Sequence, residues 1–107
     1  EADSILNGVD HQPEFNGGMP AFVEYLRANL KYPEEAQKAN MEGKVYIQFV
    51  VNKDGSAEDF KVLKSAGEPL DNEALRVLMS VPKWVPGTHQ DKLVRCTFVV
   101  PISFKKA

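Results

Sequence analysis

The final patterned stretch of the chain, residues 94–104, constrains the fold more than any other part of the sequence. Its even-numbered positions are all apolar, while its odd-numbered positions are mixed. An alternation with period two over this length, rich in β-branched and aromatic residues, predicts a long β-strand with one buried face. The residues predicted to point inward are Val94, Cys96, Phe98, Val100, Ile102 and Phe104.

Pro101 lies on the outward row of this strand and predicts where the strand sits in its sheet. Proline has no N–H to donate, so within sheets it occurs mostly on edge strands and at bulges. Successive residues of a strand direct their backbone groups to opposite sides. We therefore predict an edge strand whose open side is formed by the odd-numbered residues, and we hypothesise that a partner docks there. The predicted partner-binding residues are Arg95, Thr97, Val99, Pro101 and Ser103.

The remaining segments predict three helices and two further strands. Apolar residues recur at helical spacing in three places, and Asp71 suits the N-cap of the third helix. Two alternating segments flank Asp54-Gly55, a pair typical of a tight hairpin. The predicted helices cover residues 20–30, 34–39 and 71–81, the two further strands cover 44–52 and 58–65, and 88–92 is predicted as a loop.

This order of elements predicts an α+β fold. Hairpin neighbours pair antiparallel, and the third helix most naturally carries the chain across the sheet to place the last strand beside the first. We therefore expect a three-stranded antiparallel sheet with spatial order 2-1-3 and helices packed on one face. The last strand lies at an edge in this arrangement, in agreement with the argument from Pro101.

Composition and charge exclude several classes of protein. A chain of 107 residues fits one domain, which we place at residues 13–107, after a linker remnant or loosely ordered arm at residues 1–12. Thirteen basic and fifteen acidic residues argue against a nucleic-acid partner. No run approaches the ~18 apolar residues of a membrane span and no signal peptide opens the chain, so we expect a cytosolic protein or a soluble piece of a longer one.

No group of side chains predicts an active site, a cofactor site or a metal site. Two scattered histidines and the single Cys96 lack the spacing of zinc ligands. Helix capping accounts for the positions of Asp71 and Glu73, so these two residues need not form a catalytic pair of carboxylates. The inward position of Cys96 predicts a buried and inert thiol, and Trp84 is interpreted as a core or hinge residue. We therefore expect a binding module that is not an enzyme and uses no metal or cofactor.

Taken together, the order and spacing of several short motifs resemble the C-terminal domain of TonB, the periplasmic energy transducer of Gram-negative bacteria. The resemblance covers about residues 13–105, and the segment Phe15-Asn16-Gly17-Gly18 with the following helix is similar to the version found in Bacteroidetes. The matching motifs are Tyr32-Pro33, Glu42-Gly43-Lys44-Val45, Phe49-Val50-Val51, Asp54-Gly55, Leu70-Asp71, Pro82-Lys83-Trp84, Pro86-Gly87 and Val100-Pro101-Ile102-Ser103-Phe104.

The resemblance implies a function in transport across the outer membrane. Full-length members have an inner-membrane helix that engages the proton-driven motor proteins ExbB and ExbD. Their C-terminal domain binds the TonB box, a short extended segment of outer-membrane TonB-dependent transporters, by adding it as a strand beside the last strand. This implies a periplasmic location for the chain and assigns its docking edge to residues 94–104. A polar contact that the family makes before its Tyr-Pro pair corresponds to Asn29.

Two other functions remain open on the sequence alone. Similar domains are fused to membrane metallopeptidases resembling the BlaR sensor family, where this chain would serve as a regulatory or scaffolding domain. An uncovered edge strand also favours self-association into a homodimer.

Overall fold

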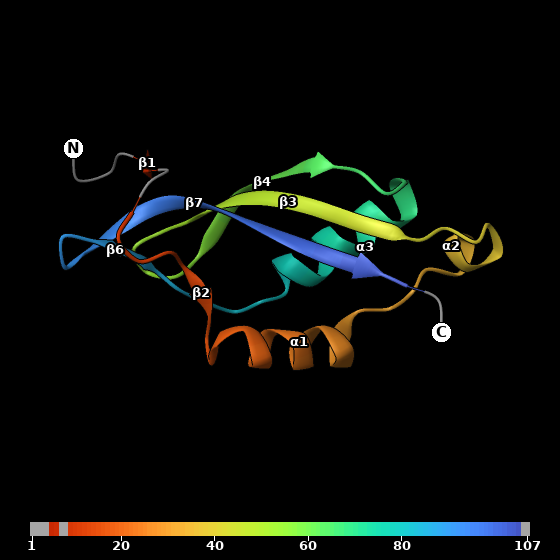
Figure 1. Ribbon diagram of the computed structural model, residues 1–107, viewed down its shortest axis with the longest axis horizontal. Helices are drawn as coiled ribbons and strands as arrows, with labels where there is room; N and C mark the ends of the chain where they lie inside the picture. Colours follow the sequence, from red (N-terminus) through yellow and green to blue (C-terminus); the bar gives the residue numbers. More distant parts are fainter. Residues whose placement is uncertain (1–4, 7–8, 106–107) are drawn as a thin grey trace.

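The longest strand pairing in the molecule joins β3 (Gly43–Val51) to β7 (Lys92–Phe104). The computed structural model describes residues 5–6 and 9–105. β3 lies between β7 and β4 (Ala57–Lys64) and is antiparallel to both (Figure 1). The β3–β7 register is unbroken from Gly43 opposite Phe104 to Val51 opposite Cys96.

The prediction of a three-stranded sheet is wrong, because short strands extend the sheet along β7. β1 (Ile5–Leu6) pairs parallel to β7 at Arg95 and Cys96, and β6 (Gly87–His89) forms a hairpin with the beginning of β7. Among the described residues, the main sheet therefore has five strands. A separate pair consists of β2 (Glu14–Phe15) and β5 (Trp84–Val85). Strands of two or three residues are too short to show the alternation on which a sequence prediction depends.

Three helices join these strands: α1 (Gly18–Asn29), α2 (Glu34–Lys38) and α3 (Glu68–Met79). The prediction that Asp71 caps α3 is wrong, since this helix begins three residues earlier, with Pro69 in its first turn. The Asp71 carboxylate instead accepts hydrogen bonds from the backbone N of Ala66 (3.0 Å) and the hydroxyl of Ser65 (2.5 Å). It thus satisfies donors just before the helix, as the acidic residue of a capping box does.

The hydrophobic core lies between one face of the sheet and the helices. Residues from all three helices, including Phe22, Ala36 and Leu70, belong to one buried cluster with inward residues of the sheet. These are Val45, Ile47, Phe49 and Val51 of β3 and Val100, Ile102 and Phe104 of β7. Of the other residues predicted to point inward on β7, Cys96 is fully buried outside this cluster, and Val94 and Phe98 are half-buried.

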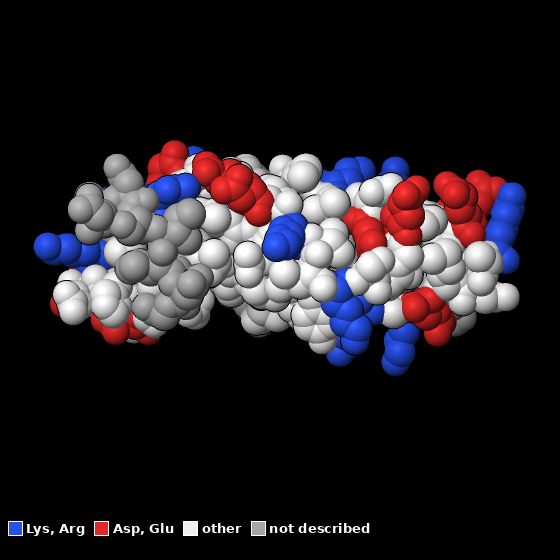
Figure 2. Space-filling model, turned by 90° about the horizontal axis from the view of Figure 1, so that it is seen from above, with Lys and Arg blue, Asp and Glu red and all other residues white. Residues whose placement is uncertain are grey.

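The described part of the molecule is elongated, with principal extents of 48 × 24 × 19 Å. On the face seen in Figure 2, the described acidic and basic side chains are interspersed, and neither sign forms a continuous surface. The longest helices within residues 5–6 and 9–105 have 12 residues, and none is long and apolar enough to cross a membrane.

Candidate docking edge

The outer edge of β7 is where the predicted docking residues lie. From residue 98 to residue 104, β7 pairs with β3 on one side, and no strand among the described residues pairs with it on the other. Val99, Pro101 and Ser103 are exposed along this stretch, and Val99 retains 41% of its accessible surface. An exposed strand edge of this kind is a template for another extended chain.

The position of Pro101 explains how the backbone groups of this edge are oriented. Pro101 lies opposite Tyr46 of β3 and has no N–H that could enter the ladder. In a regular antiparallel pair, residues that bond to the partner strand alternate with residues whose backbone groups point away from it. The ladder loses no hydrogen bond if Pro101 is one of the outward residues, and Val99 and Ser103, two positions away on either side, then point outward as well.

The beginning of the same edge is covered by the chain itself. β1 lies on the outer side of β7 at Arg95 and Cys96, so the exposed edge is shorter than the sequence predicts. Thr97 is half-buried opposite Val50, between the part covered by β1 and the exposed part. Within the arm predicted at residues 1–12, Asp10 accepts a hydrogen bond from the backbone N of Gln90 and His11 pairs with Thr88, while residues 1–4 and 7–8 lie outside the described residues.

Arg95 does not project freely from the edge. Its Nε donates to Oδ1 of Asn52 at 2.7 Å, and its guanidinium lies 3.1 Å from a carboxylate oxygen of Glu58. These contacts tie β7 to the β3–β4 hairpin. A polar hollow of about 530 Å³ lies beside these contacts. Hydrogen bonds already connect the side chains that line it, namely those of Asn52, Asp54, Ser56, Glu58 and Arg95. Arg95 therefore has a structural role in holding β7 against the β3–β4 hairpin.

A groove that the sequence analysis did not identify runs between α1 and the exposed edge of β7. Its volume is about 390 Å³. One wall comes from α1 and the segment after it, and the other comes from Pro101 and Ser103. The sequence contains one indication of this groove: α1 has more apolar residues than are needed to form a single row facing the core. The lining residues are Met19, Phe22, Val23, Leu26, Arg27, Leu30, Pro101 and Ser103.

Asn29, the remaining predicted contact residue, lies at the end of α1 and bonds within the chain. Its side-chain amide donates to the carbonyl of Tyr25 at 2.9 Å, and its own carbonyl accepts from Arg76 of α3 at 2.8 Å. The neighbouring Leu30 lines the groove, whereas Asn29 does not. The structure therefore places Asn29 near the docking edge but outside the groove.

The remaining residues considered in the sequence analysis lie elsewhere in the described part of the molecule. Within residues 5–6 and 9–105, no three His, Cys, Asp or Glu side chains are grouped so that they could hold a metal ion. Cys96 is fully buried, and burial raises the pKa of its thiol. Trp84 is also buried, in agreement with its interpretation as a core residue. The Tyr32 hydroxyl donates to the carbonyl of Met41 and its ring packs edge-on against Phe104, so this residue fixes the connection between helices and sheet.

Comparisons with known proteins identify the family. The family described as "Gram-negative bacterial TonB protein C-terminal" matches residues 28–105. Protein TonB of two Helicobacter pylori strains is 34% identical over 82 residues and 39% identical over 62 residues. These matches cover 76% and 57% of this chain, but only 29% and 22% of the relatives' length.

Solved structures agree with the sequence matches. Two NMR solution structures of the Helicobacter pylori TonB C-terminal domain superpose with TM-scores of 0.58 and 0.56, at 27% and 25% identity. The superpositions cover 80% and 87% of this chain, and 90% and 91% of the other chains. From the matched region and the shared fold, this chain belongs to the family of Gram-negative bacterial TonB C-terminal domains.

Proposed function

We propose that this chain is the transporter-binding domain of a periplasmic energy transducer. In this proposal, the TonB box of an outer-membrane TonB-dependent transporter adds as a strand to the outer edge of β7. The domain then transmits the force generated by the inner-membrane proton-motive force to the transporter and drives nutrient import. The motor proteins ExbB and ExbD would act through a part of the protein outside this chain, and the domain itself performs no chemical reaction.

The observation that carries the proposal is the exposed edge from Val99 to Ser103. Main-chain hydrogen bonds supply the affinity in strand addition, so the host strand must present outward backbone groups over several residues. From Val99 to Ser103 no described strand pairs with the outer side of β7, and its other side is anchored to β3 by an unbroken ladder. Membership in the TonB family supports the same partner class.

Strand pairing suits a domain that has to transmit force. Each backbone hydrogen bond contributes a net of about 0.5–1.5 kcal/mol, and several bonds loaded together resist shear. Pairing through the main chain also tolerates variation in the guest sequence. One transducer could therefore serve several transporters. A second copy of the chain could occupy the same edge, so a homodimer is the competing state.

An NMR titration with a synthetic TonB-box peptide from the same organism tests the proposal. We expect the amide signals of Val99 and Ser103 to shift or broaden as the peptide is added. If every TonB box of that organism leaves residues 98–104 unperturbed, the proposal is wrong. Light scattering over a dilution series reports the homodimer separately.

Two substitutions at one position separate backbone pairing from side-chain contact. Val99→Pro removes an outward N–H and should weaken peptide binding by about two- to tenfold, the equivalent of one hydrogen bond. Val99→Thr keeps the N–H and the shape of the side chain, and should bind with the affinity of the original chain. Unchanged affinity of Val99→Pro would place the guest elsewhere.

A further inference from the structure

We propose that α1 is the second wall of the docking site and that it selects guest strands with apolar side chains at alternate positions. This inference rests on the proposed function, because it names the side-chain chemistry of the segment that β7 would bind. It assigns Met19 and Val23 as specificity-determining residues.

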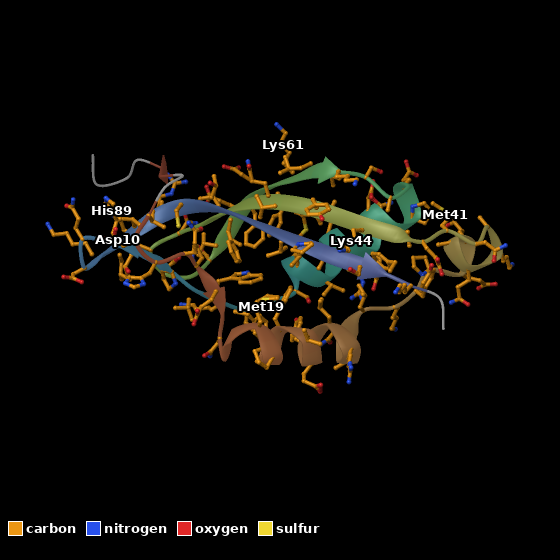
Figure 3. All side chains as sticks on the ribbon, viewed as in Figure 1. Asp10, Met19, Met41, Lys44, Lys61 and His89 are labelled. Atoms are coloured by element: carbon orange, nitrogen blue, oxygen red, sulfur yellow. The ribbon has the colours of Figure 1, made fainter. Side chains whose placement is uncertain are left out.

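Two apolar side chains of α1 are exposed where the helix borders the groove. Met19 retains 65% of its accessible surface and Val23 retains 43%, and both line the groove together with Pro101 and Ser103 of β7. Figure 3 shows Met19 on the side of α1 that faces the sheet. Exposed apolar side chains gathered around a groove indicate an interaction site more strongly than isolated ones do.

The core does not account for these two side chains. Phe22, Leu26 and Leu30 recur at helical spacing and belong to the core cluster or pack against it. Met19 and Val23 form a second row, one turn apart, beside that stripe. The apolar face of α1 is therefore wider than the part that the sheet covers, and the excess lies against the edge of β7.

The groove continues toward the core at the N-terminal end of α1. A second cavity, of about 170 Å³, shares Met19 and Phe22 with the groove and reaches Phe15, Trp84, Phe98 and Val100. Its lining is mainly aromatic and aliphatic. A side chain that enters from the outer edge of β7 at this end would meet a mainly apolar surface, with Glu14 as the charged residue in the lining.

Hydrogen bonds to α3 hold this wall in place. The Arg76 guanidinium donates to the carbonyl of Asn29, and the backbone N of Lys31 donates to the Glu73 carboxylate at 2.6 Å. Nearer the middle of α1, the hydroxyl of Tyr25 lies 2.8 Å from that of Ser80, the residue that follows α3. α1 is thus fixed to the body of the domain and does not depend on a guest for its position.

The exposed edge and the apolar wall together define the occupant. A strand paired with β7 would turn alternate side chains toward the two faces of the sheet, so that one row could enter the groove. A helix would leave the β7 backbone groups without partners, and a polar strand would leave Met19 and Val23 in contact with polar atoms.

Two isosteric peptides test the inference. The first, acetyl-Thr-Val-Thr-Val-Thr-Val-Thr-amide, has valine at alternate positions, and the second has threonine throughout. Both are β-branched, so their backbone preferences are similar. We expect the valine peptide to bind about tenfold more tightly, because at least two side chains become buried in an apolar environment. Both peptides should perturb the amides of Val99 and Ser103.

Variants of α1 complete the test as a double-mutant cycle. Met19→Gln combined with Val23→Thr should weaken the valine peptide about tenfold and the threonine peptide less than twofold. Met79→Gln is the matched control, because Met79 is 58% exposed on α3 and does not line the groove. Unchanged amide spectra outside α1 verify that the variants fold.

The outcomes distinguish this inference from the function on which it rests. Equal affinity of the two peptides, or no effect of the α1 variants while β7 is still perturbed, would overturn the inference and leave strand addition intact. A valine peptide that perturbs α1 but not β7 would also overturn it. If neither these peptides nor a TonB-box peptide perturbs residues 98–104, the proposed function and the inference are both wrong.

Discussion

Gly55, in the turn between β3 and β4, is joined backbone to backbone with Trp84 of β5. The Trp84 N–H donates to the carbonyl of Gly55 at 2.8 Å. A Cβ atom on Gly55 would lie 2.4 Å from the Trp84 carbonyl oxygen. The hairpin turn therefore positions the tryptophan that closes one end of the core.

This close approach predicts that Gly55→Ala is strongly destabilising. The residue has φ +89°, where alanine is strained, and its new methyl group would also collide with backbone atoms. We expect a loss of about 3 kcal/mol in the free energy of unfolding, measured by urea denaturation. Gly18→Ala is the matched control: its φ is +81°, but the added Cβ would meet only Pro20 Cδ at 3.8 Å. It should cost about 1 kcal/mol, and equal losses would show that the contact with Trp84 is unimportant.

Trp84 lies at the centre of a cluster of aromatic rings, which predicts a graded response to substitution. Its ring centroid is 5.0 Å from that of Phe49 and 5.7 Å from that of Phe22, and Phe15 and Phe98 pack edge-on against it. Its buried Nε1 has no hydrogen-bond partner among the described residues, so losing the N–H costs little. Trp84→Phe should destabilise the domain by about 1–2 kcal/mol and Trp84→Leu by about 2–3 kcal/mol, measured by circular dichroism during thermal unfolding. If both variants lose the same amount of stability, the geometry of the aromatic rings does not contribute to it.

Long periodic segments were predictable from the sequence because their burial follows a fixed period. The predicted inward row of β3 is buried, and so are four of the six residues predicted to point inward on β7, while Val94 and Phe98 are half-buried. The alternation fails at Leu63 of β4 because the pairing shifts there. Tyr46 faces Lys64 while Ile47 faces Val62, which leaves Leu63 as an extra residue that is 48% exposed.

The unpredicted features depend on contacts between distant residues. The β6–β7 hairpin turns at Gln90 and Asp91, both with positive φ (52° and 64°), but this pair is a much weaker turn signal than Asn-Gly or Asp-Gly. β1 pairs with β7 through backbone groups, and the pattern of side chains in the sequence does not indicate such a pairing. The groove likewise requires α1 to lie beside β7, which local periodicity does not predict.

Burial of Cys96 predicts a thiol that reacts only when the protein unfolds. The side chain is fully buried, and desolvation raises its pKa, which lowers the fraction of the reactive thiolate. At pH 8, an aromatic disulfide reagent should modify the folded protein at least ~100-fold more slowly than the chain in denaturant. Rapid stoichiometric modification under native conditions would contradict the position of Cys96 in the core.

The contacts of Glu73 predict how the stability of the folded domain depends on pH. The pKa of the Glu73 carboxyl lies below the ordinary 4.5, mainly because Arg76 donates hydrogen bonds to it. A hydrogen bond from the backbone of Lys31 lowers this pKa as well. Because the pKa is lower in the folded state, the stabilisation is fully present above pH 4.5 and is lost as the pH falls through the folded-state value. Glu73→Gln should therefore cost about 1 kcal/mol at pH 7 and progressively less in acid.

Urea denaturation between pH 7 and pH 2.5 measures this difference for the original chain and the variant. Glu24→Gln is the control, because Glu24 is 72% exposed and its nearest cation, on Arg27, is 3.7 Å away. That control should change stability by less than ~0.5 kcal/mol at any pH. The result bears on docking as well, since Glu73 and Arg76 hold the end of α1 against α3. If the cost of Glu73→Gln stays constant down to pH 2.5, the carboxylate charge does not contribute to this contact.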